Sequence, residues 1–129
     1  MRVLLDTQAW LWMAAAPERL SARARRQVED TSHTLYLSSA SAWEIAIKHA
    51  LGKLRLPEPP AAYVPSRTAA LGIVPLAIEQ AHALAAAALP PHHRDPFDRM
   101  LVAQAQLEDL LILTTNRVLA RYGVEMISA

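Results

Sequence analysis

Acidic residues stand where the expected strands and helices of this chain begin or end. Asp6 follows a short apolar run, and Glu44 lies early in a helix expected after a second run. Asp95 and Asp98 open a long amphipathic helix, and Asn116 follows a strongly apolar segment. Ligands of a parallel sheet bind beyond the carboxyl ends of its strands, where Asp6, Glu44 and Asn116 are expected. Asp95 and Asp98 are three residues apart and therefore share a helix face.

Carboxylates that meet in one pocket are expected to bind a divalent cation. Several negative charges a few ångströms apart repel one another unless a cation neutralises them. Mg²⁺ prefers oxygen ligands and usually keeps several waters, so it can orient a water and neutralise a phosphate under attack. If the fold brings the acids together, the expected reaction is the hydrolysis of phosphodiester bonds.

Each acid also has a structural interpretation. Asp6 fits the N-cap of the helix after it as well as it fits a metal ligand. Glu44 with Ser41 matches a capping box, which explains this glutamate without any ligand. Asp95 and Asp98 fit the first turn of a helix, near the positive end of its dipole. Only the joint placement of the acids favours a metal site.

Basic side chains near the acids are candidates for contacts with a phosphate. Lys48 lies one turn after Glu44, where it either steers a phosphate or forms the commoner surface pair with that glutamate. Arg94, Arg99 and Arg117 form a local basic patch or face solvent. The formal net charge is only +1, which does not by itself indicate a nucleic-acid partner. Any polyanion is therefore expected to need a local basic patch or a metal ion.

Histidine and tryptophan are expected to have structural roles. His92 and His93 are adjacent in a proline-rich loop, and neighbouring histidines seldom face one metal, so we expect a loop role for both. Trp10, Trp12 and Trp43 are expected to pack in the interior. An exposed tryptophan would instead mark a surface that contacts a partner.

The composition excludes several classes of protein. The 129 residues fit one domain, 1–129, with 53% hydrophobic but only 5% aromatic residues. The absence of cysteine excludes disulfides and thiolate metal sites, and three glycines form no phosphate-binding loop. No secretion signal is visible, and no apolar stretch approaches the roughly 20 residues of a membrane span. We expect a cytoplasmic protein with no membrane contact.

Strand and helix patterns alternate along the whole chain. Strands are expected at 2–5, 35–38, 73–76, 110–114 and 124–127, and helices at 8–16, 21–30, 41–51, 61–71, 78–88, 96–108 and 117–122. Pro75 lacks a backbone donor, which places the third strand at an edge or puts the proline at its end. The alternation predicts an α/β fold, a three-layer α/β/α sandwich around a mainly parallel sheet.

Four sequence blocks resemble PIN-domain proteins, and most closely the VapC-type ribonuclease toxins of VapBC toxin–antitoxin pairs. The blocks are RVLLDTQAWLW, SSASAWEIAIKHALGKL, HHRDPFDRMLVAQAQ and ILTTN. The resemblance covers nearly the whole chain in order. It implies a five-stranded parallel sheet and an endoribonuclease that uses Mg²⁺ or Mn²⁺. It also implies a cognate antitoxin as partner, RNA as substrate and a homodimer.

The same resemblance assigns roles to individual residues. The family's acids match three positions here, at Asp6, Glu44 and Asp98. Asp95 matches an extra acid of one subgroup. Asn116 stands where the family commonly has Asp, so it is expected to reach the metal through its carbonyl oxygen or a water without adding charge. Thr7 matches a small hydroxyl residue that is expected to hydrogen-bond to a metal-binding side chain and orient it.

Two other functions remain open. A phosphohydrolase of the haloacid-dehalogenase type also has Asp after its first strand, but it needs a second Asp two residues later, where this chain has Gln8. A catalytically weak PIN-like module would bind RNA or protein without cutting. The low net charge and Asn116 favour such a module, whereas a retained acidic cluster opposes it.

Overall fold

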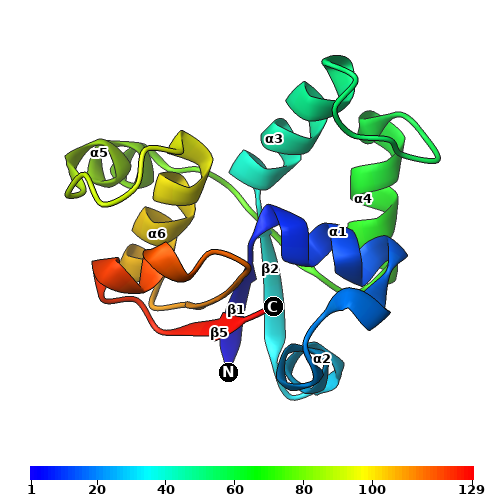
Figure 1. Cartoon of the computed structure of the whole chain (residues 1–129), viewed down its shortest axis with the longest axis horizontal. Helices are drawn as coiled ribbons and strands as arrows, with labels where there is room; N and C mark the ends of the chain where they lie inside the picture. The colour runs from blue at the N-terminus through cyan, green and yellow to red at the C-terminus, as the bar shows by residue number, and fades with distance from the viewer.

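The computed structural model describes residues 1–129 and is built around one sheet of five parallel strands (Figure 1). The strand order across the sheet is β3-β2-β1-β4-β5. The strands are β1 (Arg2–Leu5), β2 (Thr34–Ser38), β3 (Val74–Leu76), β4 (Leu111–Thr114) and β5 (Met126–Ser128). Every neighbouring pair runs parallel, which confirms the predicted fold class.

Helices cover both faces of this sheet. They are α1 (Thr7–Ala15), α2 (Ala22–Glu29), α3 (Ser39–Ala50), α4 (Pro60–Ala70), α5 (Gln80–Ala88) and α6 (Pro96–Glu108), with short 3₁₀ helices η1 (Pro17–Arg19) and η2 (Arg117–Tyr122). No helix combines the length and the apolar character that crossing a bilayer requires.

Alternate residues of the central strand β1 contact the two layers. Val3 and Leu5 pack in one cluster with buried residues of α1, α2, α3 and α4. Leu4, between them, packs in the other cluster with buried residues of α6 and η2. Because successive strand side chains point to opposite faces, this division produces the three layers.

Local sequence explains several boundaries of these elements. Pro75 lies in β3, which is an edge strand, as its missing donor predicts. Gly52 follows α3 at φ +73° and Gly72 follows α4 at φ +67°, and both are the left-handed conformations that end helices.

The predicted capping box at the start of α3 is wrong. The helix begins two residues earlier than expected, and Ser38 is its N-cap, accepting from the backbone N–H of Ala40 at 3.0 Å. Ser41 and Glu44 therefore lie inside the helix, where both are buried. Their side chains face Thr7 at the start of α1 rather than the helix end.

Candidate active site

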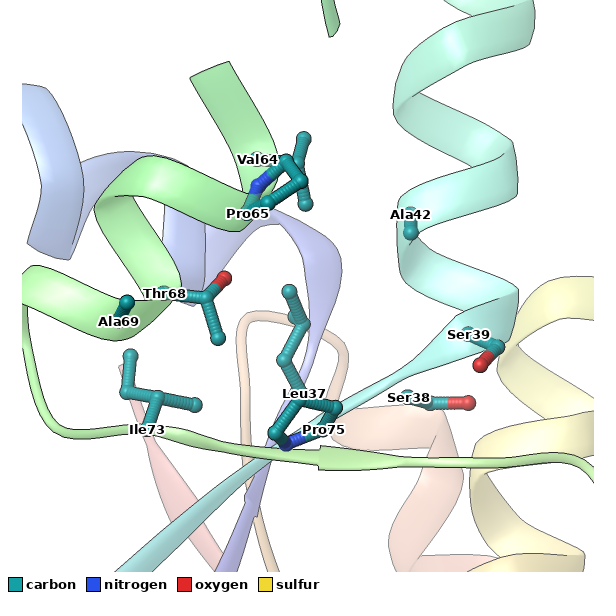
Figure 2. Close-up of a pocket in the computed structure, with 10 residues that line it drawn as sticks. All are labelled: Leu37, Ser38, Ser39, Ala42, Val64, Pro65, Thr68, Ala69, Ile73 and Pro75. Atoms are coloured by element: carbon teal, nitrogen blue, oxygen red, sulfur yellow. The ribbon is translucent and has the colours of Figure 1, made fainter. Parts of the chain in front are cut away.

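Two pockets of contrasting chemistry open in the surface. The first, of about 330 Å³, lies between α3 and α4 beside the ends of β2 and β3, and no ionisable side chain lines it (Figure 2). The second, of about 260 Å³, has a single hydrophobic residue in its lining. It is lined by Asp6, Thr7, Gln8, Leu11, Glu44, Lys48, Asp95, Asp98, Thr115 and Asn116. The second pocket is the candidate active site.

Asp6 lies where β1 ends and α1 begins, and the side chain is almost fully buried. Its Oδ1 accepts from the backbone N–H of Ala9 at 2.7 Å and so caps α1. Its Oδ2 accepts from the Thr114 hydroxyl at 2.7 Å and from the Thr115 backbone N–H at 2.8 Å. The capping role proposed for Asp6 is thus present, and the same carboxylate joins the carboxyl ends of β1 and β4.

Glu44 is held at the pocket by groups from two helices. The Thr7 hydroxyl donates to its Oε1 at 2.6 Å, and the Ser41 hydroxyl lies 3.0 Å from the Thr7 oxygen. The Lys48 ammonium lies 2.7 Å from Oε2, which is the expected pair one helical turn away. The hydrogen bond to Glu44 raises the pKa of Lys48 above its ordinary value. Lys48 therefore stays protonated and supplies a positive charge at the pocket.

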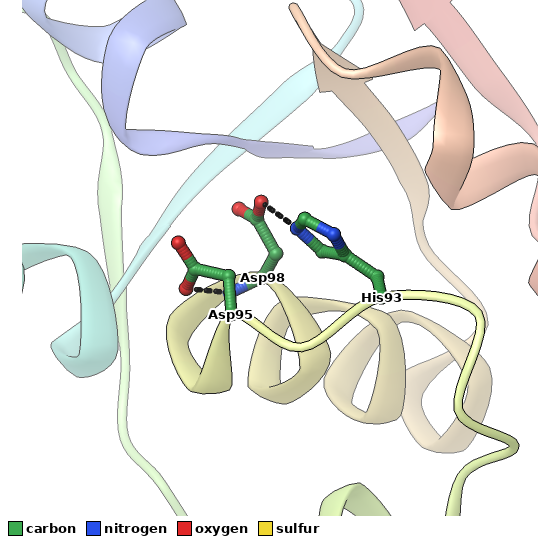
Figure 3. A group of neighbouring side chains, drawn as sticks. All are labelled: His93, Asp95 and Asp98. Carbon is green, nitrogen blue, oxygen red and sulfur yellow. Dashed lines mark hydrogen bonds and ion pairs between the residues drawn. The ribbon is translucent and has the colours of Figure 1, made fainter.

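Asp95 and Asp98 reach the pocket from the first turn of α6. Asp95 is the N-cap, and its Oδ1 accepts from the backbone N–H groups of Phe97 at 2.8 Å and Asp98 at 3.2 Å. Asp98 turns one oxygen, Oδ2, toward His93 Nε2 at 2.8 Å (Figure 3). Burial raises the pKa of Asp98, and the nearby Asp95 charge raises it further, whereas the hydrogen bond from His93 lowers it.

Asn116 presents its amide nitrogen to the site. Its Oδ1 accepts from the Val118 backbone N–H at 3.1 Å and so caps η2. This contact fixes the orientation of the amide, whose Nδ2 lies 3.4 Å from Asp98 Oδ2. The amide therefore turns its nitrogen, and not its carbonyl oxygen, toward Asp98.

The fold thus brings together residues from opposite ends of the chain. All four predicted acids line one pocket, as do Thr7, Lys48 and Asn116. Four carboxylates and one ammonium give these lining residues a formal charge of −3. Such a cluster of oxygens with excess negative charge has the donor chemistry that Mg²⁺ and Mn²⁺ prefer.

Arg99 does not face this pocket, and the predicted phosphate contact is wrong. The guanidinium donates instead to five backbone carbonyls that precede α6, those of Ala86 at 3.0 Å, Ala87 at 3.5 Å, Leu89 at 2.8 Å, Pro90 at 3.0 Å and His93 at 3.1 Å. These contacts hold the loop 89–95 against the helix. Arg94 and Arg117 are exposed and outside the pocket lining, so Lys48 is its one basic residue.

His93 is the residue of the site that the sequence pattern missed. It belongs to a group with Asp95 and Asp98 whose potential ligand atoms all lie within 4.8 Å of one another. The expectation of a pure loop role holds better for His92, which is exposed and packs its ring against Tyr122 at 5.1 Å. Only the spacing of five residues from His93 to Asp98 signals the contact.

The tryptophans divide between core and surface. Trp10 is fully buried, as predicted. Trp43 is 63% exposed, and its ring meets Phe97 edge-on at 5.5 Å between centroids. The packing expectation is therefore wrong for Trp43, whose position in α3 beside Glu44 leaves most of the indole uncovered.

The parallel sheet with an acidic pocket at its carboxyl edge defines a class of protein. The family model of the PIN domain matches residues 3–125, and the chain belongs to this family. A curated relative, Ribonuclease VapC16 of Mycobacterium tuberculosis, is 52% identical over 58 residues. That match covers 45% of this chain and 41% of the relative's length.

Solved structures share the fold at low sequence identity. A chain of the VapBC2 structure from Rickettsia felis, bound to a DNA fragment from their promoter, superimposes with a TM-score of 0.73 at 12% identity, covering 98% of each chain. A chain of the DNA-bound VapBC structure from Salmonella typhimurium has a TM-score of 0.73 at 19% identity, covering 98% of this chain and 97% of that one.

Proposed function

We propose that this protein is a VapC-type toxin that hydrolyses RNA with Mg²⁺ or Mn²⁺ held by the acidic pocket. The observation that carries the proposal is the convergence of four carboxylates, from the end of β1, from α3 and from the start of α6, in one pocket of about 260 Å³. Membership of the PIN domain family and the likeness to a curated VapC ribonuclease support it. The haloacid-dehalogenase alternative is dropped, because such an enzyme needs a second Asp two residues after the first, and this chain has Gln8 there.

The residues present fit a hard divalent cation. Asp6, Glu44 and Asp98 would hold it, with Asp95 adding charge at the pocket edge. When bound, such an ion supplies a polarised water and neutralises a phosphate oxygen. The protein's own contribution is positional. Thr7 holds the Glu44 carboxylate, two backbone N–H groups fix Asp6, and the Lys48 ammonium is placed to bind a phosphate oxygen of RNA.

The proposal includes three partners. RNA is the substrate, a cognate antitoxin neutralises the enzyme in the cytoplasm, and two copies form a homodimer. The structural neighbours come from VapBC complexes, which supports the antitoxin. Light scattering measures the mass of the purified chain alone, which tests the homodimer, and its mass after mixing with the purified antitoxin, which tests the complex.

A second candidate is a PIN-like module that binds RNA without cutting it. The observation that favours it is the amide of Asn116, which brings a donor to the pocket instead of a further carboxylate. Binding without cleavage at saturating Mn²⁺ would establish this alternative.

An RNA cleavage assay tests the main proposal. Protein stripped with EDTA is mixed with single-stranded RNA, and Mg²⁺ or Mn²⁺ is then restored. We expect cleavage only with the metal, and we expect Asp98→Asn to reduce it at least a hundredfold. Asp95→Asn is expected to retain more activity than Asp98→Asn, because one oxygen of Asp95 already accepts the hydrogen bonds that cap α6.

The exposed Glu58→Gln variant is the control for a lost acidic charge. Cleavage that persists in EDTA, or an Asp98→Asn variant as fast as wild type, contradicts the proposal.

A further inference from the structure

We propose that His93 and Asn116 are positioning residues that together hold one oxygen of Asp98 and leave its other oxygen to bind a metal. This inference rests on the proposed function, because it specifies how one acid of that site is presented. Figure 3 shows the His93 ring beside the Asp98 carboxylate, with Asp95 on the other side.

Both contacts reach the same atom. His93 Nε2 lies 2.8 Å from Asp98 Oδ2, and Asn116 Nδ2 lies 3.4 Å from it. The orientation of Asn116 is fixed because its Oδ1 accepts from the Val118 backbone N–H, so the side facing Asp98 is the donor. The Asp98 oxygen is an acceptor, so His93 meets it with an N–H at Nε2. Asn116 Nδ2 also lies 3.2 Å from this Nε2, which as a donor cannot accept from the amide, so Asp98 Oδ2 is the acceptor for both groups. Oδ2 therefore faces two donors, and Oδ1 has no such partner.

The backbone of His93 is fixed independently of its ring. The His93 N–H donates to the Tyr122 hydroxyl at 2.9 Å, and its carbonyl accepts from Arg99 at 3.1 Å. The Tyr122 hydroxyl in turn donates to the Pro90 carbonyl at 2.9 Å. These contacts anchor the loop to η2 and α6, so the position of the ring follows from a rigid support. Removing the ring is therefore expected to leave the loop in place.

A carboxylate held in this way binds a metal differently from a free one. With Oδ2 occupied, Asp98 binds through Oδ1 alone and does not rotate away from the pocket. Groups that orient a metal ligand commonly change metal affinity by about ten- to a hundredfold when they are removed. His93 and Asn116 also partly offset the repulsion between Asp98 and Asp95, because each brings a donor to the crowded carboxylates.

Mn²⁺ binding to the full-length protein tests this assignment. The signal of free aqueous Mn²⁺ in electron paramagnetic resonance reports the bound fraction without any activity measurement. We expect His93→Ala to weaken Mn²⁺ binding at least tenfold. We expect His93→Gln to remain within about threefold of wild type, because its amide places a donor near the position of Nε2.

His92→Ala is the matched control, since His92 is the neighbouring histidine and contacts Tyr122 rather than Asp98. It should bind Mn²⁺ as wild type does. Circular dichroism of each variant checks that the fold is retained.

The other possible results contradict the inference. If His93→Ala binds Mn²⁺ as tightly as wild type does, the His93 ring only packs in the loop. Equal weakening in His93→Ala and His93→Gln makes the imidazole itself a metal ligand instead of a donor to Asp98. Failure of the wild-type protein to bind Mn²⁺ overturns the proposed function as well, which separates that failure from the first two.

Discussion

Asp98→Asn is expected to stabilise the metal-free protein, although it removes a residue of the proposed site. The Asp98 side chain is 22% exposed, and its oxygen lies within 4.8 Å of a ligand atom of Asp95. Two unit charges at such a separation repel by roughly 1 kcal/mol in water and by about 3.5 kcal/mol at an effective dielectric constant near 20. The amide removes this repulsion while keeping the shape of the side chain.

The opposing effect is a weaker hydrogen bond from His93. A hydrogen bond to a neutral oxygen is worth about 1 kcal/mol less than one to a carboxylate. The difference lies between about zero and about 2.5 kcal/mol. A gain within this range of about 1 kcal/mol in the free energy of unfolding corresponds to a rise in Tm of roughly 3–5 °C for a chain of this size. The direction agrees with the raised pKa of Asp98, whose first cause is burial.

The sign of the pH dependence follows from the same pKa. Because the folded protein binds the Asp98 proton more tightly than the unfolded chain does, ionisation of Asp98 costs stability. That cost is fully present above the raised pKa and disappears as the pH falls toward the ordinary value of 3.8. The advantage of Asp98→Asn should therefore be largest near neutral pH and shrink in acid.

Thermal unfolding in EDTA measures the stability of the metal-free variant, and thermal unfolding in Mg²⁺ measures how much stability the metal adds. In EDTA the variant should melt higher than wild type, and the exposed Glu58→Gln control should not. With Mg²⁺ at about a hundred times its Kd, wild type should gain about 2.7 kcal/mol and the variant much less. A variant that melts lower than wild type in EDTA at neutral pH would refute the electrostatic argument.

Three further predictions follow from contacts at the pocket and its support. Asp6→Asn should lower the free energy of unfolding in urea by about 1–3 kcal/mol, because an amide leaves either the Ala9 N–H or the Thr115 N–H without its acceptor; unchanged stability would contradict that. Arg99→Lys should lower stability by about 1–2 kcal/mol, since an ammonium cannot span the same carbonyls. Lys48→Met should slow RNA cleavage about tenfold in kcat/KM and weaken its salt dependence, because the ammonium proposed to bind a phosphate oxygen is lost.

The pattern of the sequence predicted the parts of the fold that depend on local chemistry. An apolar run that ends in Asp6 predicts a buried strand, and Pro75 predicts an edge strand, because each effect acts within a few residues. The placement of Asp6 and Glu44 at the sheet edge follows from that pattern. Asp95 and Asp98 reach the same pocket from the start of α6. Their position depends on how α6 packs on the sheet, which periodicity alone does not determine.

The failures have a common cause in contacts that periodic patterns do not report. Ser41 and Glu44 have the spacing of a capping box, but Thr7, more than thirty residues away, binds them instead. Arg99 looks like a phosphate ligand beside two acids, yet the carbonyls of the loop 89–95 take its donors. His93 reaches Asp98 only because Tyr122 and that arginine fix the loop. Such contacts are set by tertiary structure and leave no periodic signal.

The proposed function requires that the carboxylates at the end of β1, in α3 and at the start of α6 together hold one divalent cation. A crystal soaked in Mn²⁺ and measured at the manganese absorption edge tests it directly. We expect an anomalous peak in the pocket, within about 2.5 Å of oxygens of Asp6 and Asp98. A peak on other residues, or none at saturating Mn²⁺, would show that these carboxylates do not form the metal site.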